Sequence, residues 1–274
     1  MIYEQSNFEM TELLFSAIKI SVDAGFKIME IFNNKIRIRI KRNFTPVTNA
    51  DRAANEFIVE KLSIHGIPVI SEETTVAPYS ERKNWGYLWL VDPLDGTKEF
   101  ISRSFDFTVN IALIKNNRPV LGVIYAPAYD VLYFGSEVLG SFKFDNASEL
   151  MKKKLSFEQL VAVCQKLPCM NTDVYTYLVS KSHINGKTRD YLKKDNAPKQ
   201  FISKGSSLKL CALAEGSADE YPRFGRTMEW DTAAGDAILQ GAGGKIVSVA
   251  DSQLLEYNKA DLANPEFIAY RLSN

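Results

Sequence analysis

The chain has 274 residues, of which 46% are hydrophobic and 24% charged, as in an ordinary globular protein with a sizeable core. Its 33 basic and 33 acidic residues give a formal net charge of zero, which argues against a nucleic-acid partner bound by an overall positive field. No apolar run approaches the roughly twenty residues that span a bilayer, so we expect no membrane span. The three cysteines lack metal-ligand spacing, and the first residues lack the pattern of a signal peptide. We therefore expect a cytoplasmic protein with reduced thiols, or one attached peripherally to the inner face of the membrane.

The first half of the chain is expected to form two helices and then a run of strands. Apolar residues at helical spacing predict the first helix, and isoleucines that alternate with arginine or lysine predict the strand after it. Thr48 or Asn49 can cap the second helix. The predicted elements are a helix over residues 11–32, a half-exposed strand over 36–41, a helix over 51–64, buried strands over 67–70 and 87–91, and an antiparallel meander over 106–144.

The second half of the chain alternates between strand and helix patterns. A strand-rich half followed by an alternating half predicts an α/β (α+β layered) fold, an αβαβα sandwich with two lobes. We expect an N-terminal α+β lobe over residues 1–150 and a C-terminal α/β lobe over 151–274, with the boundary between 145 and 172. The predicted elements here are strands near 174–180, 200–203, 218–221 and 245–249, and helices near 187–194, 207–215 and 231–240.

Acidic residues recur where a predicted strand ends or a predicted helix begins. Taken singly, each has a structural interpretation: a helix cap for Asp51 or Asp231, a solvated loop for Glu72, and an Asx turn for the Asp92–Asp95 pair. Taken together, these positions converge at one side of an α/β sheet, where ligands usually bind. Carboxylates in this number suit a pair of Mg²⁺ ions, so the pattern predicts a divalent-metal site.

Gly96 and Thr97 follow the paired acids in the run WLVDPLDGTKEF and can open a short helical turn. The free amides of such a turn can bind a phosphate; a simple turn is the alternative. The D-x-x-D-G-T spacing is one residue longer than the D-x-D-x-T of haloacid-dehalogenase-type phosphatases, which argues against an aspartyl nucleophile. A Walker A loop and a G-x-S-x-G elbow are absent, and two histidines are too few for a His-rich zinc site.

Several of these segments resemble a known family. WLVDPLDGTKEF and WDTAAGDAIL resemble the two signatures of the inositol monophosphatase superfamily. The segments TPVTNAD, PVISEE, LGVIYAP, GSSLKLCALAEG and YPRFGRTMEWDTAAG resemble, in order and spacing, its CysQ-type 3′(2′),5′-bisphosphate nucleotidases. The resemblance covers about residues 10–272 and implies the αβαβα sandwich of these phosphatases. Lys98, Glu99 and Phe100 favour a nucleotidase over an inositol phosphatase, and Asp236, which departs from the second signature, is assigned no metal role.

The resemblance implies a role for each site residue. Mg²⁺, as two or three ions, would be the cofactor, and Asp92 would bridge two of them. Asp51 and Thr97 would activate the attacking water with Glu72 nearby, so that no phosphoenzyme forms. The N-terminal lobe would carry the metal site, and both lobes would act as one phosphatase unit. The implied metal ligands are Glu72, Asp92, the Leu94 carbonyl, Asp95 and Asp231, the catalytic residues Asp51, Glu72 and Thr97, and the phosphate-binding residues Gly96 and Thr97.

A bisphosphate nucleotide carries a second, unreactive phosphate that needs local positive charge on this neutral chain. The C-terminal lobe offers basic side chains, together with hydroxyls and amides at the start of the 207–215 helix. His183 resembles the position that contacts adenosine in the nucleotidases; a helix-capping or surface histidine is the alternative. For Arg223 and Arg226, the alternative is a pair of exposed loop residues. The expected nucleotide-binding residues are Ser180, Ser182, His183, Ser206, Lys209, Arg223 and Arg226.

Together with these features, the resemblance implies a Mg²⁺-dependent, lithium-sensitive phosphatase that hydrolyses the 3′-phosphate of adenosine 3′,5′-bisphosphate to give AMP. 3′-Phosphoadenylyl sulfate would be a second substrate, and the implied role is recycling in sulfate assimilation. An inositol or sugar phosphatase on the same scaffold is the nearest alternative. A non-catalytic nucleotide-binding module is another, although a binder needs no water-activating pair. We expect a small-molecule nucleotide as the partner, and a monomer or homodimer.

Overall fold

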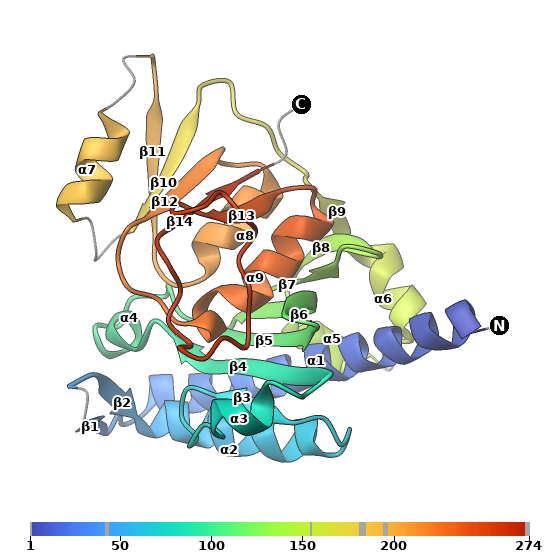
Figure 1. The fold of residues 1–274 in the computed structure, drawn as a ribbon. Helices are drawn as coiled ribbons and strands as arrows, with labels where there is room; N and C mark the ends of the chain where they lie inside the picture. The colour runs from blue at the N-terminus through green and yellow to red at the C-terminus, as the bar shows by residue number, and fades with distance from the viewer. Residues whose placement is uncertain (1, 42–43, 154, 181–184, 194–196, 272–274) are drawn as a thin grey trace.

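Layers of helix and sheet alternate through the molecule, as Figure 1 shows for the computed structural model, which describes residues 2–41, 44–153, 155–180, 185–193 and 197–271. Within these ranges, no helix is both long enough and apolar enough to cross a membrane. The helices span Ile2–Asn33 (α1), Asn49–Ser63 (α2), Tyr79–Arg82 (α3), Thr97–Ile101 (α4), Ser148–Lys152 (α5), Phe157–Val163 (α6), Gly186–Leu192 (α7), Leu208–Glu215 (α8) and Glu229–Gly241 (α9).

In the part of the chain that the structure describes, the strands form three sheets. The larger sheet has the order β3-β4-β5-β6-β7-β8-β9 and is antiparallel except between β3 and β4; the second has the order β11-β10-β12-β14-β13, and β1 pairs with β2. The strands span Ile38–Ile40 (β1), Pro46–Thr48 (β2), Val69–Ser71 (β3), Tyr87–Asp95 (β4), Thr108–Lys115 (β5), Arg118–Ala126 (β6), Val131–Ser136 (β7), Gly140–Asp145 (β8), Gln165–Leu167 (β9), Thr176–Ser180 (β10), Gln200–Lys204 (β11), Glu220–Arg223 (β12), Lys245–Ser248 (β13) and Phe267–Tyr270 (β14).

The larger sheet is buried on both faces, which explains why its central strands are apolar throughout. Side chains alternate between the faces of a strand. Trp89 and Val91 of β4 therefore pack with α1 and α2 on one face, whereas Leu88 and Leu90 pack with α8 and α9 on the other. The second sheet covers the far side of α8 and α9, and α7 lies outside it (Figure 1). This is the predicted αβαβα sandwich.

Helix α9 lies directly on the larger sheet. Gly122 of β6 has no side chain, and a Cβ atom there would lie 2.2 Å from the carbonyl oxygen of Ala234 in α9. Ser141 of β8 donates a hydrogen bond of 2.6 Å from Oγ to the carbonyl oxygen of Ile238 in the same helix. These contacts fix α9 against the sheet, and its first turn therefore has a defined position relative to the end of β4.

Most of the predicted elements are confirmed. Helix α1 begins at Ile2 rather than at residue 11, and β1 is exposed rather than half-exposed. The structure also adds β2, α3, α5 and α6, which were not predicted. The strand predicted to end at Val91 continues to Asp95, because a register shift between Asp92 and Asp95 accommodates a proline in the strand. Strands β9 and β14 were not predicted. Strand β9 adds to the larger sheet within the predicted boundary region, and the core between the sheets draws on both halves of the chain. The division into lobes at residue 150 stays a prediction.

Candidate active site

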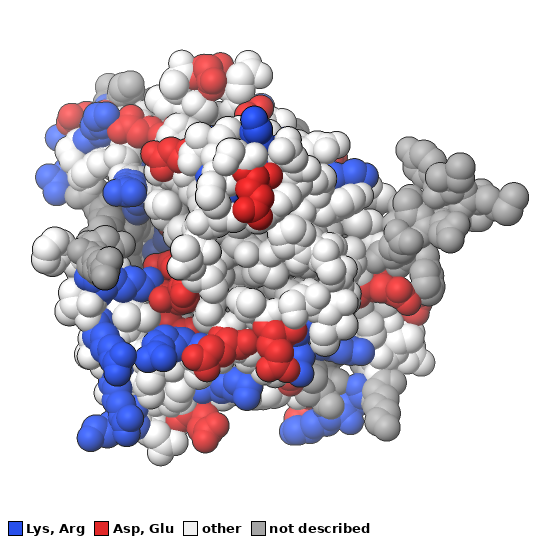
Figure 2. All heavy atoms as spheres, turned by 60° about the horizontal axis from the view of Figure 1, so that its bottom comes forward, with Lys and Arg blue, Asp and Glu red and all other residues white. Residues whose placement is uncertain are grey.

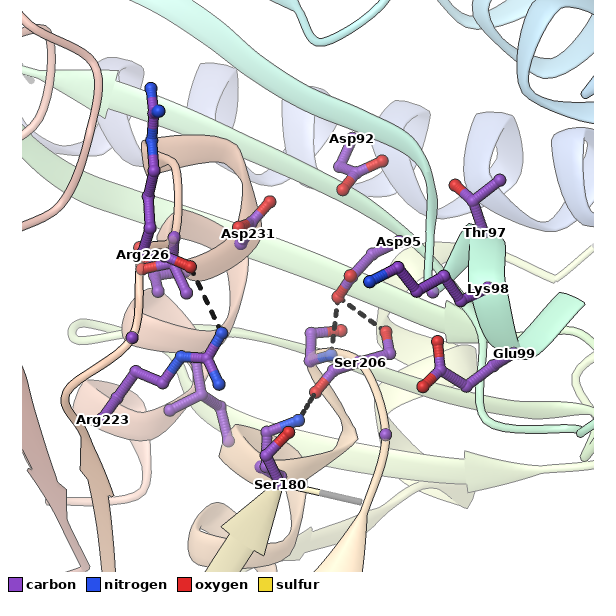
Figure 3. A pocket seen from close by; sticks show the side chains of 18 of the residues that line it. Asp92, Asp95, Thr97, Lys98, Glu99, Ser180, Ser206, Arg223, Arg226 and Asp231 are labelled. Carbon is purple, nitrogen blue, oxygen red and sulfur yellow. Dashed lines mark hydrogen bonds between the residues drawn. The ribbon is translucent and has the colours of Figure 1, made fainter. Parts of the chain in front are cut away.

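Three carboxylates from separate elements meet at the end of β4. Glu72 follows β3, Asp92 lies in the last part of β4, and Asp231 is the third residue of α9. One carboxylate oxygen from each residue lies within 4.8 Å of the others. We call these three residues the carboxylate cluster. Figure 3 shows the Asp92 and Asp231 side chains directed toward a common space.

The carboxylate cluster fits a divalent cation with oxygen ligands. Burial raises the pKa of Asp92 well above its usual range, and the nearby charges of Glu72, Asp95 and Asp231 raise it further. The pKa of Asp231 is likewise raised, first by burial and then by Asp95. A cation among these groups would stabilise the charged form of each carboxylate, against both its burial and its repulsion by the neighbouring acids. The cluster offers only hard oxygen donors, which suits Mg²⁺ better than a soft metal.

Asp95, the fourth predicted carboxylate, lies outside the 4.8 Å cluster and has its own hydrogen bonds. Its Oδ2 accepts bonds from the Ser206 hydroxyl at 2.6 Å and from the Ser207 amide at 2.7 Å. On β5, the Thr108 hydroxyl forms hydrogen bonds with the hydroxyls of both serines, and Asn110 Oδ1 accepts one from the Ser207 hydroxyl. Burial raises the pKa of Asp95, and the bond from Ser206 opposes that rise. Asp95 therefore connects the end of β4, next to the carboxylate cluster, to the turn before α8.

Asp51 and Thr97 are in direct contact, as the predicted catalytic pair requires. The Thr97 hydroxyl donates a hydrogen bond of 3.0 Å to Asp51 Oδ1. Asp51 Oδ2 accepts bonds from the amide and hydroxyl of Thr48, at 2.8 and 2.5 Å, so Asp51 also closes the capping box of α2. Burial raises the pKa of Asp51, although the bonds from Thr48 and Thr97 oppose the rise. The helix-cap interpretation thus applies to Asp51 alongside the contact expected of a catalytic pair.

Gly96 and Leu94 shape the backbone between the acids and α4. Gly96 has a left-handed conformation with φ of 94°, and a Cβ atom there would lie 2.7 Å from the carbonyl oxygen of Asp106. The turn therefore requires glycine. The Leu94 amide donates to Asp92 Oδ1 at 3.0 Å, and its carbonyl oxygen accepts from Thr97 Oγ1 at 3.4 Å.

A cavity of about 570 Å³ connects the carboxylate cluster to a group of basic side chains. We call Lys209, Arg223 and Arg226 the cationic side; in Figure 3 the two arginines lie across the cavity from Lys98 and Glu99. Burial lowers the pKa of Lys209 to about 8, although Asp95 opposes this, and its Nζ donates to the Ser206 carbonyl at 2.6 Å. On the face drawn in Figure 2, Lys and Arg side chains gather mainly along the left edge, and Asp and Glu side chains lie across the middle.

Most predicted site residues line this one cavity. Asp51 is buried behind Thr97, with 2% of its surface exposed. Ser182 and His183 lie outside the described residues, so their predicted roles stay predictions. The predicted residues that line the cavity are Glu72, Asp92, Leu94, Asp95, Gly96, Thr97, Ser180, Ser206, Lys209, Arg223, Arg226 and Asp231.

Three contributors to the site were not predicted. Lys41 Nζ lies 2.9 Å from Glu72 Oε1 and also contacts Glu73, and these acids outweigh the effect of burial and raise the pKa of Lys41. Thr108 and Asn110 on β5 support the serines that bond to Asp95. The sequence could have indicated Thr108 and Asn110, because they are two polar residues at alternate positions of an otherwise apolar strand.

Comparisons with known proteins agree with this geometry. A model of the inositol monophosphatase family matches residues 9–272. The chain is 42% identical to the 3′(2′),5′-bisphosphate nucleotidase CysQ of Buchnera aphidicola over 86% of this chain and 84% of that protein. It is 36% identical to CysQ of Escherichia coli K12 over 93% and 98% of the two chains. The crystal structure of CysQ from Bacteroides thetaiotaomicron superposes with a TM-score of 0.88 at 41% identity over all of both chains. The chain therefore belongs to the inositol monophosphatase family, whose enzymes use divalent metals.

Proposed function

We propose that this protein is a divalent-metal-dependent 3′(2′),5′-bisphosphate nucleotidase. It removes the 3′-phosphate of adenosine 3′,5′-bisphosphate and releases AMP and phosphate. The observation that carries the proposal is that one cavity joins a carboxylate cluster to a cationic side, so a substrate with two separate phosphates fits both ends. The relatives named as nucleotidases, similar over most of their length, support the same substrate class.

The metal in this proposal is Mg²⁺, with two or three ions. Glu72, Asp92 and Asp231 would hold it, together with Asp95 and the Leu94 carbonyl. When bound, Mg²⁺ supplies positive charge for the phosphate and lowers the pKa of a water molecule toward neutrality.

The chain's own residues orient that water and accept its proton. The Thr97 hydroxyl, which donates to Asp51 Oδ1 at 3.0 Å, places its oxygen at the cavity wall as an acceptor for the water. The proton passes through Thr97 Oγ1 to the Asp51 carboxylate, whose raised pKa suits a proton acceptor. The Gly96 and Thr97 amides bind the phosphate under attack. Attack is direct and in line, because the spacing of Asp92 and Asp95 does not suit an aspartyl nucleophile.

The cationic side binds the phosphate that does not react. Lys209, Arg223 and Arg226 supply positive charge at one end of the cavity, and arginine can bind phosphate with two parallel hydrogen bonds. Ser180 and Ser206 add hydroxyls to the same wall. Ser182 and His183 complete the nucleotide site in this proposal. 3′-Phosphoadenylyl sulfate is the second substrate, and the enzyme recycles a by-product of sulfate assimilation in the cytoplasm, as a monomer or homodimer.

Phosphate release from three substrates tests the proposal. Adenosine 3′,5′-bisphosphate, inositol 1-phosphate and fructose 1,6-bisphosphate are compared with Mg²⁺, with EDTA, and with Mg²⁺ plus Li⁺. We expect Mg²⁺-dependent, Li⁺-inhibited release that is fastest from the nucleotide. A preference for inositol phosphate would contradict the substrate, and equal activity in EDTA would contradict the metal. Binding of the nucleotide without phosphate release would indicate a non-catalytic module.

A further inference from the structure

Two polar residues, the buried Glu229 and the half-buried Asn264, hold the stretch of backbone that leads into Asp231. Neither residue lines the cavity. We propose that they are positioning residues, which set the cation affinity of the site by fixing the start of α9. This inference rests on the proposed metal-dependent function, because it concerns the same carboxylate cluster.

The Asp231 carboxylate is tied to the residue that precedes α9. The amide of Met228 donates to Asp231 Oδ2 at 2.9 Å, and the Asp231 amide donates to the Met228 carbonyl oxygen at 3.1 Å. One carboxylate oxygen is therefore engaged with the backbone, while the other can face a cation. Any displacement of Met228 moves or rotates the Asp231 carboxylate with it.

Asn264 holds Met228 through its side chain and its backbone. Its Nδ2 lies 2.7 Å from the Met228 carbonyl oxygen, 3.2 Å from Thr227 Oγ1 and 3.0 Å from Thr232 Oγ1. Its backbone amide donates to the Thr227 carbonyl oxygen at 2.9 Å, and Ala263 forms an isolated antiparallel bridge with Met228. Asn264 thus connects residues on both sides of Asp231.

Glu229 anchors the same stretch through its side chain. It is fully buried, and its carboxylate accepts hydrogen bonds from the amides of Asn258 and Lys259, at 2.5 and 3.0 Å, and from Lys259 Nζ at 2.5 Å. The Glu229 amide donates to the Leu262 carbonyl oxygen at 2.9 Å. Arg82 at the end of α3 bonds to Asn258 at 2.8 Å, which fixes the loop to the rest of the protein.

These contacts matter because the carboxylate cluster repels itself. Carboxylate oxygens of Glu72, Asp92 and Asp231 lie within 4.8 Å of one another, so like charges favour movement of Asp231 away from the other two unless its backbone is held. Mg²⁺ requires near-ideal octahedral geometry, and a small displacement of one ligand weakens binding. Partners that orient metal ligands typically change metal affinity by about 10- to 100-fold when removed.

Cation binding to Asn264→Ala, measured without substrate, tests the inference. Titration calorimetry with Mg²⁺ and with Mn²⁺ gives the dissociation constant of each protein, and thermal unfolding gives its stability. Ser141→Ala is the matched control, because Ser141 also donates a buried hydrogen bond to α9, at Ile238 near the other end of the helix. Glu229→Gln tests the second anchor, and Asn264→Ser, which retains one donor, replaces Asn264→Ala if that variant fails to fold.

We expect Asn264→Ala to raise the Mg²⁺ dissociation constant about tenfold or more, with a smaller rise in Asn264→Ser, and Ser141→Ala to leave it unchanged. In steady-state assays, the Mg²⁺ concentration for half-maximal activity should rise while kcat at saturating Mg²⁺ changes less. If Asn264→Ala loses stability as Ser141→Ala does but binds Mg²⁺ like the wild type, the inference is wrong and the proposed function stands. If the wild-type protein binds no Mg²⁺, both the inference and the proposed metal-dependent function are wrong.

Discussion

The carboxylate cluster and the cationic side of the cavity are built in different ways. The carboxylates come from β4, the end of β3 and the first turn of α9, which pack in the core of the sandwich. The cationic side combines Lys209, with 7% of its surface exposed, with a half-buried Arg223 and an exposed Arg226 near the end of β12. The comparison teaches that the proposed metal ligands stand on elements fixed by packing, whereas the proposed recognition of the second phosphate rests partly on an exposed loop.

Loss of one cluster carboxylate should have the largest effect. Asp92→Asn removes the central charge of the cluster, and we expect kcat/KM for adenosine 3′,5′-bisphosphate to fall by about 10³-fold or more. Asp236→Asn is the control, because Asp236 is a buried acid of α9 that bonds to Tyr257 and Gln240 and does not line the cavity. Equal losses in the two variants would show that loss of any buried acid lowers activity, and would contradict a specific role for the carboxylate cluster.

Loss of the water-orienting hydroxyl should have the next largest effect. Thr97→Ala removes the bond to Asp51, and we expect kcat to fall by about 10²- to 10³-fold with little change in Mg²⁺ affinity. Thr97→Ser retains the hydroxyl and should recover most of the activity. A Thr97→Ala variant with nearly normal kcat would exclude the proposed route for the proton.

Loss of an exposed arginine should have a smaller effect, on binding alone. For Arg226→Ala we expect KM for adenosine 3′,5′-bisphosphate to rise about tenfold, or ~1.4 kcal/mol, with kcat nearly unchanged. The effect should shrink as ionic strength rises, and it should be absent for adenosine 3′-monophosphate, which lacks the second phosphate. Arg52→Ala, an exposed arginine on α2, should change neither constant. A lower kcat in Arg226→Ala would show that the cationic side also affects the chemical step, and would contradict its assignment to binding alone.

The smallest effect should be a change in how stability depends on pH. Burial raises the pKa of Asp236 to about 6, above the usual value of about 3.9 in an unfolded chain. Between these pH values the folded state binds more protons, so this residue adds stability as pH falls from 6 toward 4 and loses it as pH rises. Urea unfolding of wild type and Asp236→Asn should therefore differ in pH slope over this window. Parallel slopes would contradict the raised pKa.

Local patterns in the sequence predict much of the fold and the acidic half of the site. Helical periodicity locates α1, α2 and α9, and the meander of β5 to β8 follows from apolar runs separated by turns. The end of β4 could not be predicted, because Asp92, Pro93 and Asp95 disfavour a strand and only the register shift accommodates them. The bond between Asp95 and Ser206 joins residues 111 positions apart, a contact that no local pattern encodes.

The contact of Gly122 with the backbone of Ala234 has a consequence for folding thermodynamics. Since α9 touches β6 at this contact without an intervening side chain, a cation shared by Asp92 and Asp231 would join two layers that already lie close together. A ligand that binds only the folded state stabilises it by RT ln(1 + [L]/Kd), about 2.7 kcal/mol at a hundredfold excess over Kd. The midpoint of thermal unfolding should therefore rise with Mg²⁺ concentration and return with EDTA. Asp92→Asn should abolish that dependence, and a wild-type midpoint indifferent to Mg²⁺ would show that no such cross-link exists.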